Sequence, residues 1–407
     1  MRAPVTDQMA THRFTAEAAK IVRSCVHCGF CNATCPTYQL TGDELEGPRG
    51  RIYLMRSLLD GGEVGEDTRR HLDQCLQCRN CETTCPSGVR YGTLLELMRP
   101  YVAENSTLPW MARLKRAALL GVVPHRARFR ALLAAGRLVR PLLPQALAQL
   151  IPASRAPLAA VSVSHARRVL LLGGCAQPAL NPNIDAAAAL IFERVGISLV
   201  TVPAAGCCGA LAMHLGAERD AVNQAKANLD AWWPEIENGA EAVMASSSGC
   251  GVHLKEYARI LSAEPGYRER AERMQSLVRD PIELLDATAL KEHVRIKSNE
   301  SLAVQAPCTL QHGQRLGGRV EQLLRELGCV LAEVREPHLC CGSAGSYSVL
   351  HGGTARQLRE RKLANLMRGR PTKIVTANIG CQSHLGATAA VPVPHWLEFL
   401  AENLLTD

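Results

Sequence analysis

Short apolar runs alternate with amphipathic segments through the C-terminal half of the chain. The runs predict buried strands, because they are brief and apolar. They occupy 167–174, 197–203 and 241–248. The segments that follow each run carry apolar residues at helical spacing. They occupy 184–196, 218–233 and 252–261. Strands that alternate with helices in this way predict a parallel sheet in an α/β domain.

The same order of segments recurs further along the chain. A second series of strands is predicted at 301–307, 329–334 and 372–378, with helices at 319–328 and 354–367. Two Cys-Cys-Gly triplets, at 207–209 and 340–342, lie 133 residues apart and align the two series. A period of this length is too long for a solenoid repeat, so it predicts two equivalent domains produced by duplication.

Two matching cysteine patterns precede this half. Residues 25–36 are CVHCGFCNATCP and residues 75–86 are CLQCRNCETTCP, and both fit C-x2-C-x2-C-x3-C-P. This spacing is typical of bacterial two-cluster ferredoxins, where three cysteines of one run and the fourth of the other hold each [4Fe–4S] cluster. The two-residue gaps let a short loop wrap one corner of a cluster, and the longer gap with proline directs the chain away.

Each expected cluster therefore takes its four thiolates from both runs. Cluster 1 is expected on Cys25, Cys28, Cys31 and Cys85, and cluster 2 on Cys75, Cys78, Cys81 and Cys35. Zinc is the alternative, because paired C-x2-C motifs also bind zinc. Eight cysteines in two matching runs closed by proline favour iron–sulfur clusters. Apolar residues at helical spacing in 47–62 and 66–74 predict a helical variant of the ferredoxin domain.

A further set of cysteines follows the predicted strands of the two equivalent domains. They are Cys175, Cys207, Cys208 and Cys250 in the first copy, and Cys308, Cys340, Cys341 and Cys381 in the second. Ligands gather at the carboxyl ends of parallel strands, so we expect the loops of each copy to converge there. Adjacent cysteines are poor disulfide partners, which favours an additional metal or redox site. Buried packing is the alternative, although it does not explain two copies in register.

The neighbours of these cysteines give three further expectations. The glycine after each cysteine pair would let the backbone approach a bulky inorganic ligand. His253 and His384 follow the last cysteine of each copy by three residues and are candidate ligands, although a lone histidine is usually structural. Cys329 falls outside the repeated pattern, so we expect it to pack in the core.

Composition restricts where this chemistry takes place. Seventeen cysteines are many for an intracellular enzyme, yet the first twenty residues are polar and no apolar stretch has the length of a membrane span. We therefore expect a cytoplasmic, reducing setting, in which clustered cysteines indicate metal or redox chemistry more often than disulfides. Aromatic residues form only 4% of the chain, which argues against a stacking platform for nucleic acid.

A basic, proline-interrupted segment separates the cysteine runs from the duplicated half. No Asp or Glu occurs between Glu104 and Asp185. The same interval holds eleven basic residues, namely Arg113, Lys115, Arg116, Arg126, Arg128, Arg130, Arg137, Arg140, Arg155, Arg167 and Arg168. It predicts short amphipathic helices that connect domains. Three interpretations of their basic face are open: it forms a solvated surface, it docks an acidic partner subunit, or it contacts an anionic membrane. We expect partner docking, through Arg126, Arg128 and Arg130.

These motifs resemble the CCG-domain proteins, which include subunits of heterodisulfide reductase, anaerobic glycerol-3-phosphate dehydrogenase, lactate-utilisation systems and glycolate oxidase. The two cysteine runs, together with GCAQPALNPN at 174–183 and ANLDAWWPEIENGAEA at 227–242, are most similar to the glycolate oxidase iron–sulfur subunits. There is one departure from the heterodisulfide reductase pattern. In that pattern the last cysteine begins a C-x2-C pair, whereas His253 and His384 stand at the second place here, so a five-cysteine ligand set is incomplete.

The resemblance implies an architecture and a function. It implies a helical two-cluster ferredoxin domain at 1–104, the connector at 105–165, and α/β CCG domains at 166–298 and 299–407. It further implies an oxidoreductase subunit that relays electrons from FAD on a partner glycolate oxidase chain, through two [4Fe–4S] clusters, to a quinone or another acceptor. The alternatives are a subunit of glycerol-3-phosphate or D-lactate dehydrogenase, or a CCG-type thiol/disulfide reductase. The expected location is the cytoplasm, with peripheral attachment to the inner face of the membrane as a further option, and no nucleic acid is expected.

Overall fold

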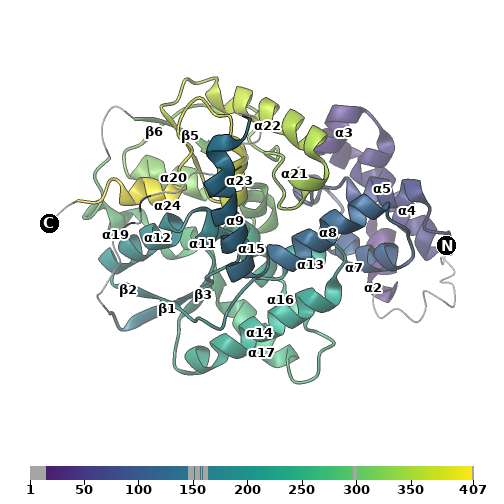
Figure 1. Ribbon diagram of the computed structural model, residues 1–407, viewed down its shortest axis with the longest axis horizontal. Helices are drawn as coiled ribbons and strands as arrows, with labels where there is room; N and C mark the ends of the chain where they lie inside the picture. The colour runs from purple at the N-terminus through teal and green to yellow at the C-terminus, as the bar shows by residue number, and fades with distance from the viewer. Residues whose placement is uncertain are drawn as a thin grey trace.

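The N-terminal part of the chain is helical, as the spacing of its apolar residues predicts. The computed structural model describes residues 15–144, 151, 156, 158, 164–296 and 300–405. The elements of the first part are α2 (Thr15–Ser24), η1 (Phe30–Thr34), α3 (Pro36–Thr41), η2 (Glu44–Glu46), α4 (Pro48–Leu59), α5 (Glu66–Asp73), α6 (Asn80–Thr84) and α7 (Tyr91–Glu104). Helices α2, α4 and α7 pack around a core that includes Met55, Leu94 and Leu95. This bundle forms one end of the molecule (Figure 1).

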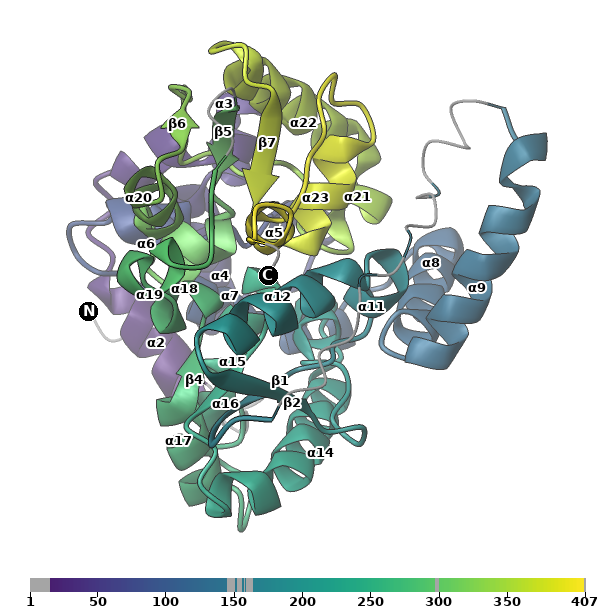
Figure 2. The same ribbon diagram turned by 90° about the vertical axis from the view of Figure 1, so that its left-hand side faces the viewer.

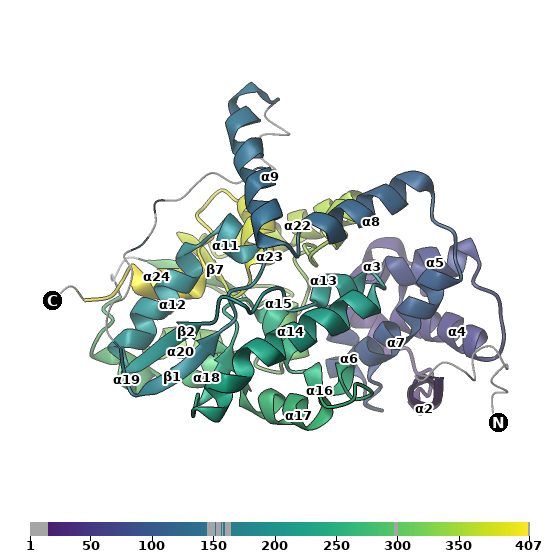
Figure 3. The same cartoon turned by 60° about the horizontal axis from the view of Figure 1, so that its bottom comes forward.

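The basic connector forms two helices on the outside of the molecule. They are α8 (Trp110–Val122) and α9 (Arg126–Val139), and the 3-10 turn η3 (Arg140–Leu142) follows. Pro109 precedes α8 and Pro124 separates the two helices, as the sequence predicts. Neither helix contains a buried residue. Both stand at the edge of the molecule, α9 furthest out (Figures 2 and 3).

Part of the connector's positive charge is used within the chain. Arg116 forms an ion pair with Asp73 at 2.7 Å. Arg126 donates to the backbone carbonyls of Gly174 (2.5 Å) and Ala205 (3.1 Å). Its guanidinium therefore holds the connector against the first CCG copy. Arg155 lies outside the described residues.

The first CCG copy contains a parallel sheet of four strands in the order β2-β1-β3-β4. Its elements are β1 (Arg167–Leu171), α11 (Gln177–Leu180), α12 (Asn183–Arg194), β2 (Ile197–Thr201), α13 (Ala210–His214), α14 (Glu218–Glu237), β3 (Ala242–Met244), α15 (Ser248–Leu254), α16 (Tyr257–Ile260), α17 (Arg268–Leu277), β4 (Val278–Arg279), α18 (Pro281–Leu284) and α19 (Ala287–Lys291). The three predicted strands are confirmed. The single helix expected over 252–261 is instead two short helices, the first of which includes Cys250.

The second copy contains a parallel sheet of three strands in the order β6-β5-β7. Its elements are β5 (Ser301–Gln305), the π-helical turn η4 (Thr309–Gly313), α20 (Arg319–Glu326), β6 (Val330–Leu331), α21 (Tyr347–Leu350), α22 (Gly352–Met367), β7 (Lys373–Thr376), α23 (Ile379–Gly386) and α24 (Trp396–Ala401). Its strand order matches β2-β1-β3, so the duplication predicted from the sequence is confirmed as a repeated α/β topology.

The two copies share one hydrophobic core. Phe192 of α12 and Phe399 of α24 belong to the same buried cluster, with both side chains fully buried. Cys329 lies in this cluster, as expected for a packing residue. The N-terminal bundle joins the first copy through buried ion pairs, in which Arg79 contacts both Glu96 (3.2 Å) and Glu256 (2.5 Å). Among the described residues, no helix is long and apolar enough to cross a membrane.

Candidate metal centre

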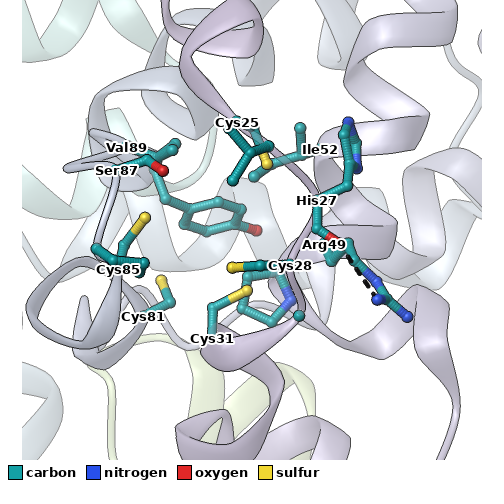
Figure 4. A pocket seen from close by; sticks show the side chains of 15 residues that line it. Cys25, His27, Cys28, Cys31, Arg49, Ile52, Cys81, Cys85, Ser87 and Val89 are labelled. Atoms are coloured by element: carbon teal, nitrogen blue, oxygen red, sulfur yellow. Dashed lines mark hydrogen bonds between the residues drawn. The ribbon is translucent and has the colours of Figure 1, made fainter.

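The four cysteines expected for cluster 1 surround one hollow. Cys25, Cys28, Cys31 and Cys85 all line a space of about 420 Å³ that is partly open to solvent. Their sulfurs turn toward one another in Figure 4. Cys81, expected in the other group, also borders this hollow. The fourth cysteine of the second run thus reaches the first three cysteines of the first run.

Both C-x2-C-x2-C loops have the same backbone geometry, which the sequence did not reveal. His27 and Gln77, at equivalent places, have φ angles of 54° each, and Gly29 and Arg79 have φ angles of 83° and 57°. Three of these four residues are not glycine, so the left-handed conformation costs each of them free energy. Left-handed turns curl each loop so that its thiols face inward. Strain repeated at equivalent positions in two loops indicates a functional requirement.

The four cysteines expected for cluster 2 lie deeper in the molecule. Cys35 and Cys81 are buried, and Cys75 and Cys78 are half-buried. The thiols of Cys35 and Cys75 are among the electrostatic neighbours of both Cys78 and Cys81. The backbone N–H of Gln77 points to the Cys75 sulfur at 3.4 Å, a contact that would favour a thiolate. Only Cys28 of the first group is exposed, so the two groups differ in their access to solvent.

The chemistry of these donors fits iron–sulfur clusters. Burial raises the pKa of Cys25, raises that of Cys31 to about 11, and raises those of Cys78 and Cys81 well above the usual range. These four thiols are therefore protonated in the absence of a metal, which must displace their protons to bind. Soft thiolates suit iron–sulfur clusters as well as zinc. In the described part of the chain, no three His, Cys, Asp or Glu side chains form a site for a single metal ion.

The cysteines of each CCG copy also come together. In the second copy the Cys308 and Cys340 sulfurs are 3.8 Å apart, and the Cys341 and Cys381 sulfurs are 3.1 Å apart. In the first copy Cys207 hydrogen-bonds with Cys175 and Cys208, and Cys208 hydrogen-bonds with Cys250. We call these sets quartet 1 (Cys175, Cys207, Cys208, Cys250) and quartet 2 (Cys308, Cys340, Cys341, Cys381). Loops from three strands thus meet at the carboxyl edge of each sheet, as the topology predicts.

The glycine after each cysteine pair serves helix packing. Gly209 and Gly342 have φ angles of 97° and 90°, which favour glycine. A Cβ atom on Gly342 would lie 2.5 Å from the Ala355 carbonyl oxygen, and one on Gly209 would lie 3.1 Å from that of Ala221. The space that each glycine leaves free is therefore taken by a helix of its own copy, α22 or α14, rather than by the ligand that the sequence suggested.

The two candidate histidines have different surroundings. Nε2 of His384 lies 3.2 Å from the Ala355 carbonyl oxygen, a hydrogen bond within the fold. His253 is buried, its ring meets that of Tyr257 edge-on, and its Nε2 has no hydrogen-bond partner among the described residues. Burial lowers the pKa of His253 to about 4, so its imidazole is neutral. His253 is thus the better placed of the two to accept a further ligand.

Quartet 2 contacts the group of four cysteines expected for cluster 2, and this contact joins residues more than 200 positions apart in the sequence. Cys78 and Cys308 pack in one small buried cluster with Cys340. Hydrogen bonds hold this junction together, because Asn80 donates to the His338 carbonyl at 3.2 Å and the Thr83 hydroxyl meets Nδ1 of His312 at 2.9 Å. The sequence places Cys78 and Cys308 in separate motifs, so only the packing of the domains reveals this contact.

Comparison with known proteins agrees with this geometry. Residues 21–89 match the family model described as a 4Fe-4S dicluster domain, and residues 169–255 and 302–386 match the cysteine-rich domain called CCG. The glycolate oxidase iron–sulfur subunit of Escherichia coli strain K12 is 48% identical over 410 residues, which cover 99% of each chain. The chain belongs to the family of glycolate oxidase iron–sulfur subunits.

More distant relatives share part of this arrangement. A probable glycolate oxidase iron–sulfur subunit of Bacillus subtilis strain 168 is 29% identical over 88% of this chain and 87% of its own. Lactate utilization protein A of Geobacillus thermodenitrificans is 26% identical over 54% of this chain and 90% of its own. A crystal structure of a hypothetical protein from Helicobacter pylori aligns with 96% of this chain and 72% of its own, at a TM-score of 0.57 and 10% identity. That structure shows the fold alone.

Proposed function

We propose that this chain is the electron-transfer subunit of a flavin-dependent glycolate dehydrogenase, an oxidoreductase that acts on a CH–OH group. The observation that carries the proposal is the gathering of Cys25, Cys28, Cys31 and Cys85 around one hollow, in a chain of the glycolate oxidase iron–sulfur family. A partner chain would bind FAD and oxidise glycolate to glyoxylate. This chain would accept the two electrons one at a time and pass them to a quinone or another acceptor.

The residues of this chain would bind two [4Fe–4S] clusters and control access to them. Cys25, Cys28, Cys31 and Cys85 would hold cluster 1, and Cys75, Cys78, Cys81 and Cys35 would hold cluster 2. When bound, the clusters supply one-electron redox chemistry. The left-handed loops orient the thiols, and the burial of Cys35 and Cys81 would exclude water from cluster 2, which would tune its potential.

Exposure of the two groups supports a direction for the electrons. Cys28 is exposed, and its loop presents Val26 and Phe30 with 69% and 61% of their surface accessible. Apolar side chains around an accessible redox group suit the surface of a flavoprotein partner. Electrons would therefore enter at cluster 1 and move inward to cluster 2, which adjoins quartet 2. Quartet 1 and quartet 2 are proposed as additional metal or redox sites, with His253 and His384 as weaker candidates.

The test is anaerobic reconstitution with the co-purified flavoprotein. Addition of glycolate should reduce both clusters, observed by EPR, more readily than glycerol 3-phosphate or D-lactate. Cys28→Ser should slow this reduction strongly, whereas Cys329→Ala, a core cysteine outside both groups, should not. Preferential reduction by glycerol 3-phosphate or D-lactate would instead assign the chain to a glycerol-3-phosphate or D-lactate dehydrogenase. Thiol–disulfide turnover by this chain alone, lost in Cys340→Ser while the clusters persist, would contradict the proposal.

A further inference from the structure

The two cysteine groups differ in burial, and this difference alone opposes electron flow toward the interior. Cys28 of the first group is exposed, whereas Cys35 and Cys81 of the second group are buried. A cluster bound by four thiolates is anionic and gains a further negative charge when it is reduced. Burial disfavours that added charge, so it would lower the potential of cluster 2 relative to cluster 1. Electrons that move inward therefore require a positive charge close to cluster 2.

Arg99 of helix α7 places a positive charge beside Cys75. Its Nη2 donates to the carbonyls of Cys75 at 3.3 Å and Leu72 at 3.4 Å, and its Nη1 donates to the His214 carbonyl. Its Nε has no partner among the described residues, and no carboxylate in that part of the chain forms an ion pair with it. Burial lowers the pKa of Arg99, and Cys75 is the neighbour that opposes this most, but an arginine stays charged.

The other charged groups around Arg99 do not cancel its charge. Asp73 is a negative neighbour of Arg99, but its Oδ2 already accepts from Arg69 at 3.2 Å and from Arg116 at 2.7 Å. Burial raises the pKa of Tyr91 well above its usual range, so this phenol is neutral. Three arginines and one aspartate therefore leave the surroundings of cluster 2 positive on this side.

The arginines nearest the cysteine runs have carboxylate partners, unlike Arg99. Arg49 beside cluster 1 forms an ion pair with Glu44 at 2.6 Å, and 39% of its side chain is exposed, so water screens its charge. Arg51 is buried near the cysteines of cluster 2, but it forms an ion pair with Glu46 at 2.6 Å. The charge of Arg99 is therefore the one that distinguishes the surroundings of cluster 2 from those of cluster 1.

We propose that Arg99 sets the order of the two potentials, so that cluster 2 has the higher potential of the pair. Arg99 is not a ligand and acts through its charge, which stabilises the reduced, more negative state of cluster 2. The inference rests on the proposed function, in which the two clusters form one relay. In the step that Arg99 favours, cluster 1 is oxidised by loss of one electron and cluster 2 is reduced by the same electron. No bond forms or breaks, and no proton is taken up.

The test is a redox titration of the anaerobically purified full chain, with dithionite as the reductant and EPR as the probe of both clusters. Cys85→Ser, which should keep cluster 2 alone, assigns the signals. In the wild type, cluster 2 should be reduced first. Arg99→Gln should lower the equilibrium constant for electron transfer from cluster 1 to cluster 2 at least about tenfold, or about 59 mV for a one-electron couple. Arg295→Gln removes an exposed arginine as the matched control and should stay within about twofold of wild type.

Arg99→Lys separates the charge of Arg99 from its hydrogen bonds. Lysine keeps the positive charge but loses the fixed fork of the guanidinium, so the constant should stay within about threefold of wild type. If Arg99→Gln loses iron, Asp73→Asn decides, because removal of a negative neighbour should raise the constant at least about threefold. The role of Arg99 would be overturned by an unchanged constant in Arg99→Gln, by equal shifts in Arg99→Lys and Arg99→Gln, by an unchanged or lower constant in Asp73→Asn, or by a wild type in which cluster 1 is reduced first.

The titration separates this inference from the proposed function, because it uses neither glycolate nor the flavoprotein. A lower constant in Arg99→Gln, with clusters that glycolate and the flavoprotein fail to reduce, would overturn the proposed function and leave the role of Arg99. Reduction of both wild-type clusters by glycolate, with an unchanged constant in Arg99→Gln, would overturn the role of Arg99 and leave the proposed function.

Discussion

Lys362 occupies in the second CCG copy the position that Asn228 holds in the first. Each residue lies seven positions after the alanine whose carbonyl packs against the glycine of the cysteine pair, Ala355 or Ala221. Asn228 donates to the Cys207 carbonyl at 2.8 Å, and Lys362 donates to the Glu336 and Pro337 carbonyls at 3.1 and 3.0 Å. The two quartets are thus electrostatically different, because only quartet 2 has a buried cation at this position.

Removal of that cation should change the potential of cluster 2. Lys362 is almost fully buried near quartet 2, and quartet 2 adjoins Cys78. A positive charge stabilises a reduced, more negative group, so Lys362→Met should lower the potential of cluster 2 by on the order of 20–60 mV. Cluster 1 should keep its potential. EPR-monitored redox titration measures both, with the exposed Lys291→Met as the control. Equal potentials in Lys362→Met and wild type would refute this role.

Charge reversal on the outer connector helix should weaken assembly with the partner. Arg128 and Arg130 are exposed on α9, although Arg128 donates one hydrogen bond to the Gly121 carbonyl at 2.8 Å, whereas Arg126 is half-buried against the first CCG copy. Arg128→Glu with Arg130→Glu should therefore reduce co-purification of the flavoprotein at least tenfold at low salt, and the loss should shrink as salt screens the interaction. Lys291→Glu with Arg295→Glu makes the same charge change on another surface. If both double variants assemble like the wild type, α9 is not the docking surface.

Much of the fold was predictable because local patterns and duplication agree. The strands that became β1, β2, β3, β5 and β7 are apolar runs of strand length, and the second series repeats the first. The strand β4 was missed because Val278 and Arg279 are too few residues to form a pattern. The helix that carries Cys381 was missed because Gly380 and Gly386 interrupt its helical spacing.

The cysteine groups were predictable as sets, but their mutual placement was not. The spacing of the two runs assigns Cys25 and Cys85 to one group, because in ferredoxins with this pattern the fourth cysteine of each run binds the cluster of the other run. The contact of Cys78 with Cys308 depends on how the bundle packs on the second CCG copy, and no local pattern encodes that.

The exchange of fourth cysteines makes a sharp prediction. Cys85→Ser should remove cluster 1 and about four irons per chain, because Cys85 borders the hollow with Cys25, Cys28 and Cys31. Cys35→Ser should remove cluster 2 by the same amount. Iron analysis with EPR of the reduced protein distinguishes them, and Cys329→Ala should lose no iron. Loss of the cluster 2 signal in Cys85→Ser would mean that each run holds its own cluster.

A buried carboxyl between the two CCG copies should make stability depend on pH. Asp280 accepts from Gln314 Nε2 of the second copy at 2.8 Å, and burial raises its pKa to about 6. The folded chain then keeps a proton that the unfolded chain loses above pH about 4. Stability therefore falls as pH rises from about 4 to 6, by on the order of 3 kcal/mol in total.

Asp280→Asn removes this titration, so its urea midpoint should rise relative to wild type between pH 5 and 7. Asp286→Asn, at an exposed helix N-cap, is the control and should follow the wild-type profile. Parallel profiles for Asp280→Asn and wild type would show that Asp280 does not titrate in this range.

The central claim is that two groups of four cysteines carry electrons as iron–sulfur clusters. Iron and acid-labile sulfide per chain, measured on anaerobically purified protein together with EPR after reduction, test it most directly. The account predicts at least eight irons and eight sulfides with the signals of two [4Fe–4S] clusters, and any iron beyond eight would lie at the quartets. A colourless protein that contains zinc and no labile sulfide would contradict it.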